Sequence, residues 1–113
     1  MINKFRVAFK GLFYAFCDKS VKIQVVLGII AIIAGFIFKL GFFEWLIIVI
    51  CIGMVIGAEI INTAIERLCD LIDEQHNPRI GYIKDISAGA VLLICIMSVV
   101  VALMIFIHKI GGF

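Results

Sequence analysis

The apolar stretch WLIIVICIGMVIGA at residues 45–58 runs directly into the polar stretch EIINTAIERLCD at residues 59–70. A helix needs about 20 mostly apolar residues to cross the hydrocarbon core of a bilayer. The uncharged part is shorter than that, so a membrane helix formed here must continue past Glu59 to about Asn62. This helix therefore carries a carboxylate at or near the membrane boundary.

Two more blocks without a charged residue lie on either side, at residues 23–38 and 86–107. The first is short, but the flanking Lys22 and Lys39 can extend their ammonium groups to the headgroups. We therefore expect three transmembrane helices. Their expected ranges are about 21–39, about 43–70 with a cytoplasmic extension, and about 85–108.

The composition agrees with a membrane protein. Of 113 residues, 65% are hydrophobic and 16% are charged, and the mean hydropathy is +1.25. A water-soluble domain of this size keeps too much surface in contact with solvent to hide so many apolar side chains. The net charge of +2 is too small for a nucleic-acid partner. We expect an all-α integral membrane protein whose residues 1–113 form a single domain.

The N-terminal segment has the pattern of an amphipathic helix over about 4–18. Its apolar residues recur at helical spacing, and its cations lie away from that stripe. Such a helix is expected to lie on the membrane surface. The stripe consists of Phe5, Phe9, Leu12, Phe13 and Phe16, and the cations are Lys4, Arg6 and Lys10.

The distribution of cations predicts the topology. Eight Lys and Arg residues precede the first span or lie between the second and third, whereas only Lys39 and Lys109 lie on the other side. Because cytoplasmic loops carry the excess of Lys and Arg, the N-terminus is expected in the cytoplasm and the C-terminus outside. Asn77-Pro78 predicts a cytoplasmic turn over 73–81. Gly53 and Gly57 form a GxxxG pattern that favours close helix packing.

The chemistry is concentrated at the cytoplasmic end of the second span. On a helix that turns about 100° per residue, five polar residues fall within one stripe. They are Glu59, Asn62, Thr63, Glu66 and Asp70. Three carboxylates on one stripe repel one another, so a cation is expected among them.

A solvated helix end would account for Glu66 and Asp70, but not for Glu59, because an ionisable group at membrane depth is energetically expensive and marks a functional site. Oxygen ligands of this kind suit Mg²⁺ and, with it, a nucleotide. The sequence contains no GxxxxGK[ST] loop, no GxGxxG and no HRD or DFG triplet. The residues themselves therefore indicate a metal-dependent site at the lipid boundary, and they do not identify a reaction.

The stretch EIINTAIERLCD at 59–70, together with KDISAGAVL at 84–92, resembles the signature of the prokaryotic diacylglycerol kinase family, which includes the undecaprenol kinases. The resemblance covers nearly the whole chain. It implies a small homotrimeric membrane kinase with sites between subunits, which transfers the γ-phosphoryl group of ATP to a lipid hydroxyl with Mg²⁺. By the same resemblance, Glu59 matches the catalytic base and Glu66 a metal-binding glutamate. The positions that match ATP- or substrate-binding residues are Asn62, Asp70, Lys84 and Asp85.

The family has a further metal-binding glutamate just before the first span, and this chain departs from it. Alignment on Lys22-Ile23 puts Asp18 at that position, whereas alignment without a gap from Gly11 puts Lys19 there. We favour Asp18, because it keeps the spacing of four between the acid and Lys22.

The residues of both motifs are more similar to those of the undecaprenol kinase branch. Undecaprenol is therefore the expected acceptor, and diacylglycerol is the alternative. The resemblance implies the inner membrane of a bacterial cell. Two hypotheses from other classes are a small proton-coupled transporter and a membrane scaffold or holin-like protein. A transporter of this size normally has four spans with its acid in the first, and a scaffold has no need of the polar residues at 59–70 and 84–85.

Overall fold

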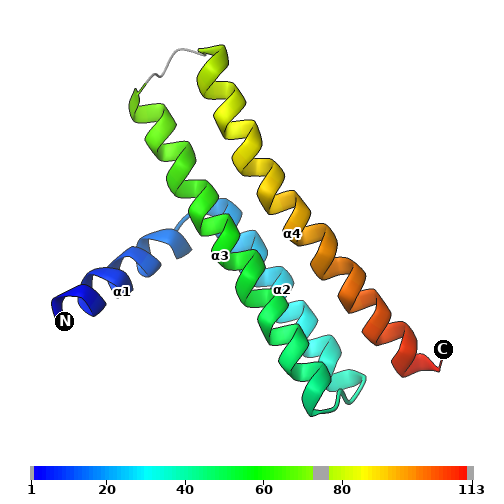
Figure 1. The fold of residues 1–113 in the computed structure, drawn as a ribbon. Helices are drawn as coiled ribbons and strands as arrows, with labels where there is room; N and C mark the ends of the chain where they lie inside the picture. Colours follow the sequence, from blue (N-terminus) through cyan, green and yellow to red (C-terminus); the bar gives the residue numbers. More distant parts are fainter. Residues whose placement is uncertain (1, 73–76, 112–113) are drawn as a thin grey trace.

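The computed structural model describes residues 2–72 and 77–111 and shows only helices among them. In chain order these are α1 (Ile2–Phe16), α2 (Lys19–Ile37), α3 (Phe42–Ile72) and α4 (Pro78–Ile110), shown in Figure 1. Three of them, α2, α3 and α4, are long and apolar enough to cross a membrane. The expectation of an all-α chain with three candidate spans is therefore confirmed.

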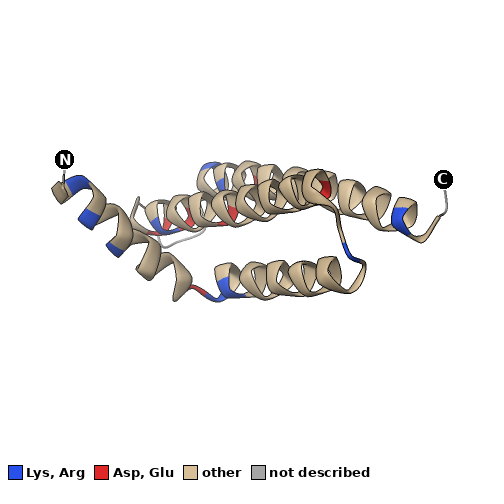
Figure 2. Ribbon diagram, turned by 90° about the horizontal axis from the view of Figure 1, so that it is seen from below, with Lys and Arg blue, Asp and Glu red and all other residues tan. Residues whose placement is uncertain are grey.

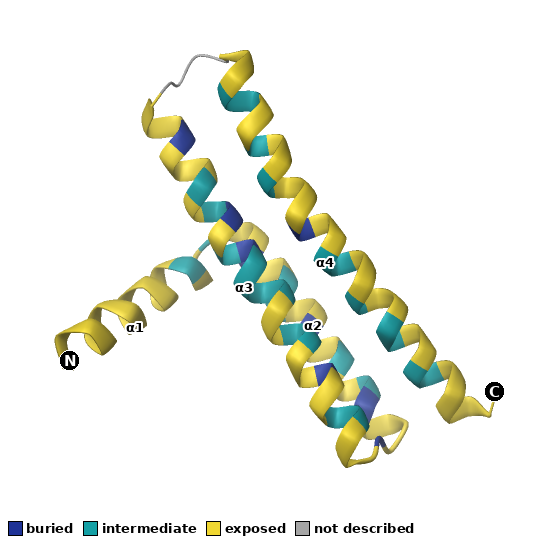
Figure 3. Ribbon diagram, in the orientation of Figure 1, coloured by how far each residue is buried: buried dark blue, intermediate teal, exposed yellow. Residues whose placement is uncertain are grey.

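Helix α3 is the centre of the arrangement, because α2 and α4 both pack against it. Consecutive long helices run in opposite directions, while α1 leaves the group at an angle (Figure 1). Helix α1 buries no residue, and its cations lie along its length (Figure 2). Most of the large apolar side chains on all four helices are exposed (Figure 3). This surface suits a lipid environment or contacts with further protein.

The turn from α2 to α3 is tight and carries its own caps. Lys39 adopts a left-handed backbone conformation with φ 56°, and the next residue, Leu40, is buried. The backbone N–H of Gly41 donates to Glu44 Oε1 at 2.8 Å. A glutamate that reaches back to the residue before a helix satisfies a backbone donor that the helix leaves free.

Glycines on α2 allow α3 to approach closely. A methyl group added at Gly28 would lie 3.0 Å from Ile52, and one added at Gly35 would lie 2.6 Å from Trp45. Gly53 and Gly57, in contrast, face open space within the chain. The close approach between spans in one chain therefore uses Gly28 and Gly35 and does not use the GxxxG pattern.

Helix α4 begins earlier than the sequence predicted. It starts at Pro78, where the expected start was about residue 85, so residues 78–81 of the expected turn are helical. Asn77 caps the helix, because its side chain accepts from the backbone N–H of Arg79 at 2.9 Å. Proline is tolerated at the first helical position, where no N–H is needed. Asn77-Pro78 is thus a helix start, and the remainder of the expected turn, 73–76, lies outside the described residues.

The other boundaries differ from the expected ones by a few residues. Helix α1 ends at Phe16 and not at about residue 18, because Asp18 caps the start of α2 by accepting from the backbone N–H of Ser20 at 3.2 Å. Helix α3 continues two residues past Asp70 to Ile72. It thus continues well beyond its uncharged stretch, as residues 59–72 are also helical.

Ion pairs near both ends of α3 set its register against α4. Lys84 Nζ lies 2.5 Å from Asp70 Oδ1 near one end, and Lys109 Nζ lies 3.0 Å from Glu44 Oε1 near the other. Both pairs join the two helices in the antiparallel arrangement of Figure 1. Apolar side chains alone would set this register weakly, because lipid tails are equally good partners for them.

Gly35→Ala should lower the midpoint of unfolding in detergent, because the added methyl would meet both Trp45 and Leu40 closely. Overpacking of this kind destabilises a protein by about 1–3 kcal/mol. Trp45 is the single tryptophan of the chain, so its fluorescence during denaturation with sodium dodecyl sulfate reports on this contact. Gly11→Ala is the control, since a methyl there meets nothing within 4 Å. Equal midpoints for the two variants would contradict the close packing.

Candidate functional site

The polar residues expected to act together gather on the second half of α3, where the start of α2 and the first turns of α4 pack against it. Figure 2 shows acidic residues along this part of α3 and another between α1 and α2. Glu59 and Asn62 are buried, with 7% and 6% of their surface exposed, whereas Glu66 and Asp70 are exposed. The stripe therefore runs from a buried end to an open one.

Asn62 links α3 to α4. Ser87 Oγ on α4 donates to Asn62 Oδ1 at 2.7 Å, and Asn62 Nδ2 donates to Glu66 Oε1 at 3.0 Å. Because both sides of the amide are used, a buried polar group is satisfied rather than left unpaired. Asn62, one turn earlier on α3, thus holds the side chain of Glu66.

Glu59 lies three residues before Asn62 on the same helix face. Its carboxylate makes no hydrogen bond or ion pair with any residue that the structure describes. Glu59 is therefore a buried residue whose carboxylate has no partner among the described residues. A carboxylate in this state can accept a proton or a hydrogen bond from a bound hydroxyl group.

Asp18 reaches α3 from the connection between α1 and α2. Its Oδ2 accepts from Thr63 Oγ1 at 3.3 Å, and its Oδ1 lies 3.2 Å from Arg67 Nη2. Lys19 is exposed and begins α2. Of the two residues that the alignment left open, Asp18 is the one that lies against the polar stripe.

Lys84 pairs with Asp70 across the α3–α4 interface at 2.5 Å. This is the kind of cation that three carboxylates on one stripe were expected to require. Asp85, the next residue, is exposed, and within the described residues it makes no hydrogen bond or ion pair. The structure thus brings Lys84 to the stripe and leaves Asp85 outside its contacts.

Three contacts at this site were not predicted from the sequence. Arg67 pairs with Asp18, Thr63 bonds to the same carboxylate, and Ser87 donates to Asn62. Thr63 and Arg67 are four residues apart and share one face of α3. Ser87 lies three residues after Lys84, and these two share one face of α4. This spacing was a signal, but it does not say which helix those faces meet.

Glu66 and Asp18 have the donor atoms that Mg²⁺ prefers. The ion usually takes one or two protein carboxylates and completes its shell with water and substrate phosphates. Among residues 2–72 and 77–111, no group of three or more acidic, histidine or cysteine side chains could hold a metal. The described residues therefore form no all-protein metal cage.

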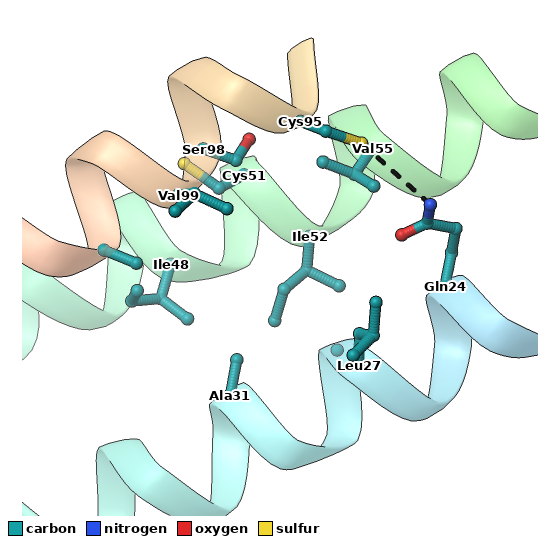
Figure 4. Close-up of a pocket in the computed structure, with 12 residues that line it drawn as sticks. Gln24, Leu27, Ala31, Ile48, Cys51, Ile52, Val55, Cys95, Ser98 and Val99 are labelled. Carbon is teal, nitrogen blue, oxygen red and sulfur yellow. Dashed lines mark hydrogen bonds between the residues drawn. The ribbon is translucent and has the colours of Figure 1, made fainter. Parts of the chain in front are cut away.

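A cavity of about 240 Å³ lies between α2, α3 and α4, outside this stripe (Figure 4). Its walls are mainly apolar, with Leu27 and Ala31 on α2 and Ile52 on α3. Gln24 Nε2 lies 3.9 Å from Cys95 Sγ at its edge. None of the predicted site residues lines it, so it is not where the carboxylates act.

Comparison with known proteins identifies relatives of this chain. The sequence profile of the prokaryotic diacylglycerol kinase family matches residues 6–106. An undecaprenol kinase of Bacillus subtilis (strain 168) is 41% identical over 78 residues, which are 69% of this chain and 63% of that protein. A diacylglycerol kinase of Synechocystis sp. (strain ATCC 27184 / PCC 6803 / Kazusa) is 30% identical over 103 residues, which are 89% of this chain and 59% of that protein. The matches thus cover less than two thirds of the length of either relative.

The contact of Asp18 with α3 can be tested by cross-linking. Asp18→Cys combined with Thr63→Cys should form a disulfide within one chain under mild oxidation, because the two side chains now lie 3.3 Å apart. The four native cysteines are first replaced by alanine. Peptide mass spectrometry without reduction identifies the link, and Lys19→Cys with Thr63→Cys is the matched control, which should stay reduced.

Equal linking in the control would contradict a selective contact of Asp18 with α3, and stronger linking in the control would place Lys19, and not Asp18, against α3. A disulfide found only between two copies of the chain would show that the start of α2 packs on a neighbouring copy.

Proposed function

Because the chain belongs to the prokaryotic diacylglycerol kinase family, we propose that it is a membrane lipid kinase, which transfers the γ-phosphoryl group of ATP to a lipid alcohol with Mg²⁺. The observation that carries the proposal is the position of Glu59, a buried residue whose carboxylate has no partner among the described residues and which shares its helix face with Asn62 and Glu66. The resemblance of both motifs to the family signature supports the same assignment.

Glu59 is proposed as the catalytic base. A lipid alcohol holds its hydroxyl at the boundary between headgroups and hydrocarbon, where the apolar part of α3 ends and Glu59 begins the polar stripe. A base within hydrogen-bond reach takes the proton of that hydroxyl as its oxygen attacks phosphorus. The absence of a competing cation or donor on Glu59 within the described chain leaves its oxygens available for this contact.

Glu66 and Asp18 are proposed to hold Mg²⁺, with Asn62, Asp70, Lys84 and Asp85 at the nucleotide and acceptor. When bound, the ion neutralises charge on the phosphates, and phosphoryl transfer then depends mainly on positioning and electrostatics. Lys84 adds a cation beside Asp70, and Asn62 orients Glu66. Arg67 is a second cation near these residues, and its guanidinium group pairs with Asp18.

Undecaprenol is the proposed acceptor, and the product is then undecaprenyl phosphate. The residues of both motifs favour the undecaprenol kinase branch, and one relative is named undecaprenol kinase. Diacylglycerol, which would give phosphatidic acid, is the second candidate, and the other relative is named for it. No described residue distinguishes a polyprenyl chain from acyl chains.

The proposal includes a location and an assembly. The excess of Lys and Arg on α1, at the start of α2, near the end of α3 and at the start of α4 supports a membrane protein with its N-terminus and site in the cytoplasm and its C-terminus outside, and the family resemblance supports a bacterial cell membrane. Family resemblance supports a homotrimer with sites between subunits. The exposed apolar faces of α2, α3 and α4 offer the surface that such an assembly buries.

The first test offers undecaprenol and diacylglycerol side by side with Mg-ATP to purified protein in mixed micelles. We expect phosphate transfer that is faster to undecaprenol, and a loss of at least about 100-fold in Glu59→Gln, because general bases contribute about 10²–10⁴-fold. Faster transfer to diacylglycerol would reverse the acceptor assignment. Near-native turnover in a folded Glu59→Gln variant would remove the assigned base, and no transfer to either lipid would sink the kinase assignment.

Glu66→Gln should change the metal requirement. An amide is a weaker ligand for Mg²⁺ than a carboxylate, so half-maximal activity should need at least about 10-fold more Mg²⁺, in addition to a lower maximal rate. The measurement is a Mg²⁺ titration of initial rates at fixed ATP. Ser98→Ala, which changes a residue of the apolar cavity outside the stripe, is the control and should titrate like the parent protein. An unchanged titration in Glu66→Gln would argue against ligation by Glu66.

A further inference from the structure

We propose that Ser87 is a positioning residue for the metal-binding carboxylate of Glu66, acting through the amide of Asn62. The inference rests on the proposed function and deepens it, since it assigns a role on α4 to a residue that the family motifs left without one. Its basis is the chain of hydrogen bonds from Ser87 Oγ to Asn62 Oδ1 at 2.7 Å and from Asn62 Nδ2 to Glu66 Oε1 at 3.0 Å.

The chain has only one possible direction. An ionised carboxylate can only accept hydrogen bonds, so the nitrogen side of the Asn62 amide must face Glu66. The oxygen side then faces α4 and needs a donor, which the Ser87 hydroxyl supplies. The Ser87 hydroxyl therefore holds the oxygen side of the amide in place while its nitrogen side bonds to Glu66, which limits the motion of both side chains.

Burial makes this orientation important. Asn62 is only 6% exposed, so water replaces a lost partner poorly, and an unsatisfied buried acceptor is destabilising. Glu66 is exposed and has a long side chain, and among the described residues Asn62 is its only hydrogen-bond partner. Holding one oxygen of Glu66 in place reduces the ordering that metal binding would otherwise require.

The position of Ser87 also ties the metal site to the packing of α3 and α4. Ser87 is half-buried and lies three residues after Lys84, so both side chains face α3 from the same side of α4. Lys84 reaches Asp70 and Ser87 reaches Asn62, which brackets Glu66 between them along α3. A loss of the Ser87 hydroxyl therefore acts on the part of α3 that carries the proposed metal ligand.

The test measures Mn²⁺ binding directly, by electron paramagnetic resonance, to the purified full chain in lipid nanodiscs with a non-hydrolysable ATP analogue present. Ser87→Ala and Ser87→Val should weaken Mn²⁺ binding by about 3- to 10-fold, less than the roughly 10- to 100-fold effect of losing a direct outer-shell partner, because Ser87 acts one residue further from the metal. Ser87→Thr keeps the hydroxyl and should bind as the parent protein does. Thr and Val have nearly the same shape, so their difference isolates the hydrogen bond.

Two controls separate positioning from general loss of structure. Ser98→Ala removes a half-buried serine of the same helix that lines the apolar cavity, and it should leave Mn²⁺ binding unchanged. In an Asn62→Ala background, Ser87→Ala should add no further loss, because the hydroxyl acts through the amide. Should Ser87→Ala not fold, Ser87→Cys, whose thiol is a weaker donor, takes its place in the comparison.

The results that overturn the proposal are distinct from those that overturn the kinase assignment. Native Mn²⁺ binding in Ser87→Ala, with Glu66→Gln impaired, would remove the role of Ser87 and leave the proposed function standing. Equal losses from Ser87→Ala with and without Asn62 would show that Ser87 does not act through the amide. An absence of Mn²⁺ binding in the parent protein would overturn both.

Discussion

The register of α3 against α4 is the constraint on which the site depends. Polar contacts join the two helices at three levels, through Lys84 with Asp70, Ser87 with Asn62, and Lys109 with Glu44. In a bilayer, apolar side chains gain little by leaving lipid for another helix, so packing and polar contacts decide which residues face each other. A shift of α4 by one residue would turn its polar side chains away from α3. The stripe on α3 would then lose its cation and the partner of its buried amide.

Helix α2 joins α3 by a different means. Gly28 and Gly35 let α3 approach closely along the apolar part, while Asp18 makes polar contacts at the start of α2. The Asp18 carboxylate caps α2 and also contacts Thr63 and Arg67 on α3. The same group that begins the first span therefore places a carboxylate against the helix that carries the proposed metal ligand. Helix α2 therefore contacts α3 by close apolar packing along its length and by polar contacts at its start.

Much of the candidate site was predictable from the sequence, because helical periodicity alone puts Glu59, Asn62, Glu66 and Asp70 on one face. The need for a cation among the carboxylates was also predictable from charge repulsion, and Lys84 supplies one. The partners on other helices were not predictable in the same way. Spacing along one helix says which residues share a face, but it carries no information on what that face meets. Family resemblance supplied roles for several residues, and it said nothing of Arg67 or Ser87.

The sequence by itself determined the helices and their number of candidate spans, since long uncharged apolar runs can satisfy their backbone groups in a bilayer only as helices. It misjudged the start of α4, because Asn77-Pro78 suits a turn and a capped helix start equally well, and only the backbone after Pro78 distinguishes them. The sequence favoured Asp18 over Lys19 by spacing, and the tertiary structure brought Asp18 into contact with α3. The tertiary structure alone decided that the Asn62 amide is held between Ser87 and Glu66. The contacts between helices join residues far apart in the chain, and their geometry depends on the angle and register at which whole helices pack.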